Sequence, residues 1–171
     1  GKPKGACLSH ANLLANIRDI LQVIRVSERD RFICLLPMFH SFALTVCILL
    51  PLYMGVRTVL FRAIRPFKRV LRSIRRNRIT IFVGIPPIFN VLKETRLPWF
   101  LRGGVVKLVS PLRLCISGAS ALSPDVIAVF EDKFKIPLLE GYGLTEAAPV
   151  VSINRPGRFR RTGSVGLPLP S

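Results

Sequence analysis

The stretch "LRLCISGASALSPDVIAVFEDKFKIPLLEGYG", residues 112–143, decides the fold because two apolar runs flank one helical segment. The runs "LRLCISG" (112–118) and "IPLLEG" (136–141) are typical of buried strands. Between them, Ser123-Pro124-Asp125 predicts a helix start, with a capping serine, a proline at the first helical position and an acid in the first turn. Apolar strands joined by a helix predict a parallel pair that is covered on both faces.

The same alternation runs along the rest of the chain. We expect strands at 31–37, 56–61 and 79–84, a loop at 99–111, and helices at 9–24, 42–55 (ending near Pro51 or Gly55), 66–78 and 86–95. No internal repeat interrupts the pattern. The sequence therefore predicts an α/β fold with a mostly parallel sheet and helices on both faces.

Composition and charge limit the function classes. The chain has 171 residues, half of them hydrophobic, which is enough for one core. Its four cysteines show no C-x-x-C spacing and indicate core thiols in a reducing compartment. The longest uncharged apolar run, 41–56, is interrupted by Pro51 and is short for a membrane span, so we expect a cytoplasmic protein.

Two small-residue turns follow predicted strands, where ligands bind in such sheets. These are "SGASAL" (117–122) and "GYGLTE" (141–146). Their glycines let the backbone approach a ligand closely, Tyr142 offers a flat ring for a base, Thr145 can donate to a phosphate, and Glu146 offers a hard oxygen to Mg²⁺. The alternative is a hairpin or helix-capping turn whose tyrosine packs in the core and whose Glu146 caps a helix.

Two further segments have both a functional and a structural interpretation. "GKPKG" (1–5) lacks the strand and the Ser or Thr of a P-loop, but its lysines could grip a polyphosphate; alone, it is better explained as a solvated basic loop. His40, in "LPMFHSF", either lines a pocket near a substrate carboxylate or is a hydrogen-bonded turn histidine.

The quoted motifs together resemble a known family. "GKPKG…SH", "LPMFHSF", "SGASAL", "EGYGLTEAAP" and "GSVGLPLP" occur in the order and approximate spacing of the acyl-adenylate-forming (AMP-binding) superfamily. The chain looks most similar to long-chain fatty-acid CoA ligases and the acyl-[acyl-carrier-protein] synthetase branch. The resemblance implies ATP-dependent activation of a fatty acid to an acyl adenylate, followed by transfer to the thiol of CoA or an acyl carrier protein.

The resemblance also implies roles for individual residues in nucleotide binding. It places Lys2, Lys4 and Gly5 in a mobile phosphate loop. It forms one wall of the adenine site from Gly118, Ala119 and Ser120. It forms the other wall from Glu140, Gly141, Tyr142 and Gly143, with Tyr142 stacking on the base.

For the reacting groups, the resemblance implies that Thr145 contacts the α-phosphate and that Glu146 binds magnesium. His40 would line the tunnel of the substrate carboxylate. Mg²⁺, amide donors and lysines would then neutralise the charge that opposes attack of one anion on another.

The same comparison suggests that residues 1–171 are an internal fragment of the large N-terminal adenylation domain. The Ser/Thr-Gly-rich half of the phosphate loop, the ribose-binding aspartate and the small C-terminal domain with its catalytic lysine are expected elsewhere. We therefore expect the isolated 171 residues to be inactive.

The basic residues suggest a partner surface. The chain carries 26 lysines and arginines against nine acids, and residues 57–78 contain nine basic residues and no acid. The segment 66–78 predicts an amphipathic helix that is basic outside its apolar stripe. Such a helix is either an ordinary solvated face or a docking surface for anionic lipid, at the inner face of the membrane, or for an acidic carrier protein.

Two other functions stay open at this point. A basic nucleic-acid-binding module has the charge, but the interleaved aromatics and recognition motifs of such modules are missing. An adenylating ligase for aryl or amino acids shares the motifs, although the pocket segments offer no carboxylate for an amino group.

Overall fold

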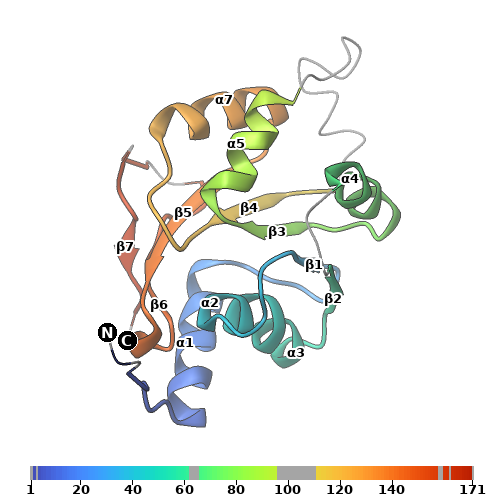
Figure 1. Cartoon of the computed structure of the whole chain (residues 1–171). Helices are drawn as coiled ribbons and strands as arrows, with labels where there is room; N and C mark the ends of the chain where they lie inside the picture. The colour runs from blue at the N-terminus through green and yellow to red at the C-terminus, as the bar shows by residue number, and fades with distance from the viewer. Residues whose placement is uncertain are drawn as a thin grey trace.

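The computed structural model describes residues 2, 4–61, 66–95, 111–157, 160–161 and 163–170. Helices and strands alternate along most of the chain (Figure 1). The helical elements are α1 (His10–Val23), α2 (Ser41–Ala43), the π-helix η1 (Leu44–Leu49), α3 (Leu50–Tyr53), α4 (Phe67–Arg76), α5 (Pro86–Glu94), α7 (Pro124–Phe134) and the 3-10 helix η3 (Thr145–Ala147). The strands are β1 (Arg31–Cys34), β2 (Arg57–Leu60), β3 (Ile81–Gly84), β4 (Leu114–Ser117), β5 (Leu138–Gly143), β6 (Val150–Ile153) and β7 (Leu167–Pro168).

The strands form one sheet in the order β2-β1-β3-β4-β5-β6-β7. The four pairs from β2 to β5 are parallel, and β6 and β7 add to the sheet in antiparallel fashion. All residues of β3 and β4 are buried, as expected for strands covered on both faces. The predicted mostly parallel α/β fold is confirmed.

The helices lie in two layers. In Figure 1, α5 and α7 cover one face of the sheet, and α1, α2 and α3 cover the other. The chain steps from β1 outward to β2 and then back across to β3, so right-handed crossovers place the intervening helices on opposite faces. Strand order thus reverses between β1 and β3, the position at which α/β sheets bind ligands.

Most predicted elements are confirmed within a few residues of their bounds. Ser9 caps α1 through a hydrogen bond from the Asn12 amide to its hydroxyl, and the Asn12 side chain completes the capping box. Ser123 occupies the N-cap position of α7, but its side chain accepts no capping hydrogen bond, so its predicted capping role is wrong. Most of the predicted loop at 99–111 lies outside the described residues.

The apolar segment 42–55 stays helical past Pro51. Pro51 has no N–H, so in an α-helix the carbonyl of Cys47 would lack its partner. That carbonyl instead accepts a hydrogen bond from the Thr58 hydroxyl at 3.0 Å. The π-helix η1 leads into α3, which contains Pro51 and ends at Tyr53, shortly before Gly55, whose φ of 65° suits glycine.

Strands β6 and β7 are the main elements that the sequence did not predict. They are short, and the ladder between β5 and β6 begins beside a proline and a bulge near Gly143. Cys34, Cys47 and Cys115 are buried as predicted, whereas Cys7 is exposed. None of the described helices combines the length and the apolar character needed to cross a bilayer.

Candidate functional site

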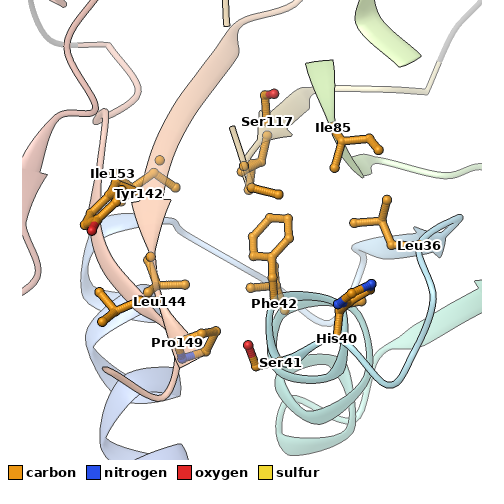
Figure 2. Close-up of a pocket in the computed structure, with 18 of the residues that line it drawn as sticks. Leu36, His40, Ser41, Phe42, Ile85, Ser117, Tyr142, Leu144, Pro149 and Ile153 are labelled. Carbon is orange, nitrogen blue, oxygen red and sulfur yellow. The ribbon is translucent and has the colours of Figure 1, made fainter. Parts of the chain in front are cut away.

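A cavity of about 420 Å³ opens at the carboxyl ends of β1, β3, β4 and β5. Its walls come from the predicted turns and from the segment that follows β1 (Figure 2). The lining residues are Ile20, Leu36, Pro37, His40, Ser41, Phe42, Ala43, Val46, Ile85, Ile116, Ser117, Gly118, Ala119, Gly141, Tyr142, Gly143, Leu144, Thr145, Pro149, Val150 and Ile153. The parallel sheet therefore brings the distant segment after β1, residues 36–43, together with the turns that follow β4 and β5.

The turn after β4 is shaped by close packing at Gly118. A Cβ atom there would lie 2.8 Å from Cζ of Phe42, a distance that real Cβ contacts essentially never show. Ala119 adopts a left-handed φ of 73°. The buried carboxylate of Glu140 accepts a hydrogen bond from the Leu122 amide at 2.8 Å. Glu140 thus fixes this turn against β5 and does not itself line the cavity.

The second turn is both a hairpin and a cavity wall. β5 and β6 are antiparallel, and residues 144–149 connect them. A Cβ at Gly143 would lie 2.4 Å from the carbonyl oxygen of Pro149, so the glycine is required for this close approach. Tyr142 is 52% exposed and lines the cavity, so the alternative in which its ring packs in the core is wrong.

Thr145 and Glu146 begin the short helix η3 at the rim of the cavity. The Thr145 hydroxyl lies 3.2 Å from the Ser41 hydroxyl, which joins this turn to the segment after β1. Leu144, and not Glu146, holds the N-cap position of η3, so the helix-cap interpretation of Glu146 is wrong. Glu146 is exposed and forms no ion pair with the described residues. Its carboxylate is therefore available to a cation.

His40 lies at the N-cap position of α2, where its side chain makes no capping hydrogen bond. Its ring packs against Phe39 at a centroid distance of 4.6 Å and lines the cavity. In Figure 2, Phe42 rises into the space between His40 and Leu36 on one side and Tyr142 and Leu144 on the other. His40 therefore lies on the cavity wall, and its place beside a substrate carboxylate stays a prediction.

Several predicted site residues are not brought to the cavity. Lys2, Lys4 and Gly5 are exposed near the N-terminus and are not among the lining residues, nor are Ser120 and Glu146. Gly5 has open space around it, with no atom within 4 Å of a Cβ built there. The geometry thus brings five residues of the two predicted walls to the cavity and leaves the others apart from it. The five are Gly118, Ala119, Gly141, Tyr142 and Gly143.

The sequence did not identify the apolar part of the lining. Ile20, Val46 and Ile116 looked like ordinary core residues because helix or strand periodicity alone gives them buried positions. Ser41 and Phe42 stand in the quoted "LPMFHSF" motif, directly after His40, which was the available signal. The described residues that line the cavity include no Asp, Glu, Lys or Arg.

Sequence comparison supports one family. Residues 1–171 match the family described as AMP-binding enzyme. The chain is 33% identical over 174 residues to a long-chain-fatty-acid–CoA ligase of Yersinia pestis and 32% identical over 174 residues to one of Bacillus subtilis. It is 30% identical over 169 residues to a feruloyl-CoA synthase of an Amycolatopsis species. Each alignment covers 98% or more of this chain but only 30–33% of the relative.

Solved structures show the same fold. ATP-bound MatB from Rhodopseudomonas palustris superposes with a TM-score of 0.86 at 28% identity, over 99% of this chain and 32% of that one. O-succinylbenzoate coenzyme A synthetase from Bacillus subtilis, in complex with ATP and magnesium, gives 0.83 at 25% identity, over 100% of this chain and 34% of that one. This similarity and the family match over the whole length lead to one conclusion: the chain belongs to the AMP-binding enzyme family.

Proposed function

We propose that this chain carries the nucleotide and carboxylate site of an adenylate-forming ligase. The ligase joins a carboxylic acid to ATP, with release of pyrophosphate, and then passes the acyl group to a thiol. The observation that carries the proposal is an apolar cavity with Thr145, Ser41 and His40 on its wall and Glu146 beside it. Relatives that bind ATP support ATP as the nucleotide.

The residues present fit a nucleotide. Tyr142 is exposed between two glycines, at each of which an added Cβ would meet backbone, so the local backbone path favours a ring that is open to a purine. Gly118 and Ala119 form the facing wall. Thr145 offers a hydroxyl to a phosphate oxygen, and Ser41 fixes its orientation. Lys2, Lys4 and Gly5 belong to a phosphate loop that approaches the cavity when nucleotide binds.

The residues also fit a magnesium ion. In the described part of the chain no three His, Cys, Asp or Glu side chains cluster as a metal site, and Mg²⁺ commonly takes one or two carboxylates and completes its shell with phosphate and water. Glu146 supplies such a carboxylate. When bound, the metal neutralises charge on the phosphates. The protein's own contribution is to orient the phosphate through Thr145 and to enclose the reacting carboxylate beside His40.

We propose a long-chain fatty acid as the substrate. The apolar lining suits an alkyl chain and offers no carboxylate for an amino acid's ammonium group. The fatty-acid ligases of Yersinia and Bacillus are relatives of this chain. An aryl acid is the second candidate, because Phe42 and Tyr142 stand in the cavity and feruloyl-CoA synthase is also a relative.

A substrate panel tests both candidates. We expect the full-length protein that contains this sequence to catalyse ATP–pyrophosphate exchange with long-chain acids, and Mg²⁺ to be required. The acyl product is then followed with CoA and with an acyl carrier protein as acceptors. Exclusive use of aryl acids would replace the fatty-acid proposal with the second candidate, and absence of exchange with every acid would contradict the proposed function.

We further propose that residues 1–171 form part of an adenylation domain. The chain spans about 30% of the length of the long-chain ligases that it matches. We expect the isolated 171 residues to be inactive because other segments complete the nucleotide site. Robust ATP–pyrophosphate exchange by the isolated polypeptide would contradict this expectation.

For the partner of α4 we propose an anionic membrane surface, at which a cytoplasmic enzyme would meet its fatty acid. Val70 and Ile74 anchor α4 in the core. The exposed basic residues of α4, of the residue after its C-cap and of the start of β2 are Lys68, Arg69, Arg72, Arg75, Arg76, Arg78 and Arg57. Leu71 is 40% exposed among them. Each cation contributes on the order of 1 kcal/mol near an anionic surface.

Vesicle co-sedimentation tests this surface. Replacing Lys68, Arg69 and Arg72 by serine is expected to weaken binding to anionic vesicles roughly 10- to 100-fold at low salt. The matched control removes three exposed cations elsewhere, Arg18, Arg29 and Arg161. Equal binding to neutral and anionic vesicles would contradict the proposal, and selective binding of an acidic carrier protein would assign the surface to that partner instead.

A further inference from the structure

Asn16 links the central part of α1 to the turn that carries Thr145 and Glu146. The residue is 7% exposed. Its side-chain amide donates to the Val150 carbonyl at 2.7 Å and to the Ala147 carbonyl at 3.4 Å. Its side-chain oxygen accepts a hydrogen bond from the Val150 amide at 3.2 Å. One side chain therefore holds the end of η3, at Ala147, and the first residue of β6, at Val150.

A hydrogen bond from the Leu144 amide to the Pro149 carbonyl at 2.9 Å closes the turn, but the helix η3 inside it has little support of its own. η3 is three residues long and buries none of them. Within the turn, the Ala147 amide bonds to the Leu144 carbonyl at 3.0 Å, and the Ala148 amide bonds to the Thr145 carbonyl at 3.2 Å. A single 3-10 turn of this kind is a weak element. Its position relative to the cavity therefore depends on contacts from outside the turn.

The helix α1 is well placed to supply such a contact. Ile17, Ile20 and Ile24 are at most 3% exposed and fix the helix in the core. Its N-terminus is closed by a capping box at Ser9. Asn16 thus transmits the rigid position of a buried helix to a short exposed turn.

We propose that Asn16 is a positioning residue that holds Thr145 and Glu146 in register with the nucleotide phosphates. The inference rests on the proposed function, because it assigns Asn16 to the phosphate and metal side of that site. Asparagine is suited to the task because its amide both donates and accepts, whereas an aspartate of the same shape can only accept. With aspartate at position 16, the Val150 and Ala147 carbonyl oxygens would face a carboxylate that repels them.

The test compares Asn16→Ser and Asn16→Asp in the full-length protein, with ATP–pyrophosphate exchange as the assay. Serine is too short to bridge the turn and adds no charge. In Asn16→Ser we expect the KM for Mg·ATP to rise about tenfold, because one or two hydrogen bonds to the turn are lost. The KM for the carboxylic acid is expected to stay within about twofold, because most of the apolar lining does not depend on Asn16.

Ile24→Ala is the matched control, because it removes a buried side chain at the C-cap of the same helix, about 12 Å from Asn16 along the axis. It is expected to lower the melting temperature and leave both KM values unchanged. If Asn16→Asp does not fold, Asn16→Ser carries the comparison alone.

An unchanged KM for Mg·ATP in a folded Asn16 variant would overturn the proposal, as would equal increases in both KM values. A separate result would contradict the proposed function itself, namely adenylate formation that stays intact in Thr145→Val and in Glu146→Gln. If those two variants lose activity and the Asn16 variants do not, only the positioning role is refuted.

Discussion

Polar side chains at the two ends of the central strands differ in whether they have hydrogen-bonding partners within the protein. At the amino ends, Asp30, Thr80 and Arg113 each stand immediately before a strand, β1, β3 and β4, and bond to one another. At the carboxyl ends, Glu146 and His40 lack such partners in the described part of the chain, and Thr145 meets only a serine hydroxyl. Satisfied buried groups stabilise a fold, whereas groups left available at a cavity can bind a ligand.

The amino-end network is built around one buried carboxylate. Asp30 is 3% exposed, and Arg113 contacts both of its oxygens at 2.7 Å. Burial disfavours its charged form and would raise its pKa. Hydrogen bonds from Arg113, Ser27 and Thr80 outweigh that effect and lower the pKa of Asp30 to about 2. This network therefore contributes stability, and protein partners occupy both oxygens of the Asp30 carboxylate.

The largest expected effect tests the carboxyl end. Glu146→Gln should lower kcat/KM for adenylate formation roughly 100-fold, because it removes the charge that holds magnesium, while the melting temperature stays the same. Glu28→Gln, the same change at an exposed acid before β1, is the control and should have no effect. Full activity of Glu146→Gln at limiting Mg²⁺ would remove Glu146 from the site.

The converse change tests the amino end. Asp30→Asn should lower the free energy of unfolding by about 2–3 kcal/mol, because it leaves Arg113 without its charged partner. Urea unfolding measures the change, and the KM values of the folded variant should match those of the wild type. Asp125→Asn is the control, since Asp125 pairs with Lys93 on the surface and should cost less than about 1 kcal/mol.

Acid should weaken the amino-end network specifically. The pKa of Asp30 falls from 3.8 to about 2 on folding, so its stabilisation is complete above about pH 4 and is lost as the pH falls toward 2. The shift corresponds to about 2 kcal/mol. Unfolding experiments between pH 6 and 2 should therefore show that the difference in unfolding free energy between wild type and Asp30→Asn narrows as the pH falls. A gap that stays constant over this range would contradict the assignment.

Two glycines at the carboxyl end should respond differently to alanine. Gly143→Ala meets the Pro149 backbone and should cost about 1–3 kcal/mol of stability. Gly118→Ala meets only the Phe42 ring, which can turn into the cavity, so its main effect should be a severalfold higher KM for the acid. Thermal melts and acid titrations separate the two outcomes. Equal stability losses would show that Phe42 cannot move.

The smallest effect concerns the thiols. Cys7 is exposed, and the other three cysteines are buried. Alkylation of the native protein should modify Cys7 alone, with no change in stability. Mass spectrometry counts the modified thiols, and labelling of a buried cysteine would reveal local opening of the sheet.

Local sequence predicted much of the fold because each strand and helix carries its own signal. Apolar runs marked β1, β3 and β4, and Ser9 marked the start of α1. The glycine turns marked both cavity walls. By contrast, β6 is defined by pairing with β5, and β7 by pairing with β6, rather than by patterns of their own. No local rule indicated that the Thr58 hydroxyl would donate a hydrogen bond to the Cys47 carbonyl, which Pro51 leaves without a backbone donor.

The sequence by itself determined the α/β class, the two turns at the strand ends and the candidate roles of Tyr142, Thr145 and Glu146. Their spacing along the chain follows from local backbone chemistry, which a sequence carries directly. Only the tertiary structure decided that Ser41 meets Thr145, that Phe42 fills the space above Gly118, and that Asn16 holds the turn from a distant helix. These contacts join residues roughly 75 to 135 positions apart, so they depend on how the sheet is ordered, which no local pattern encodes.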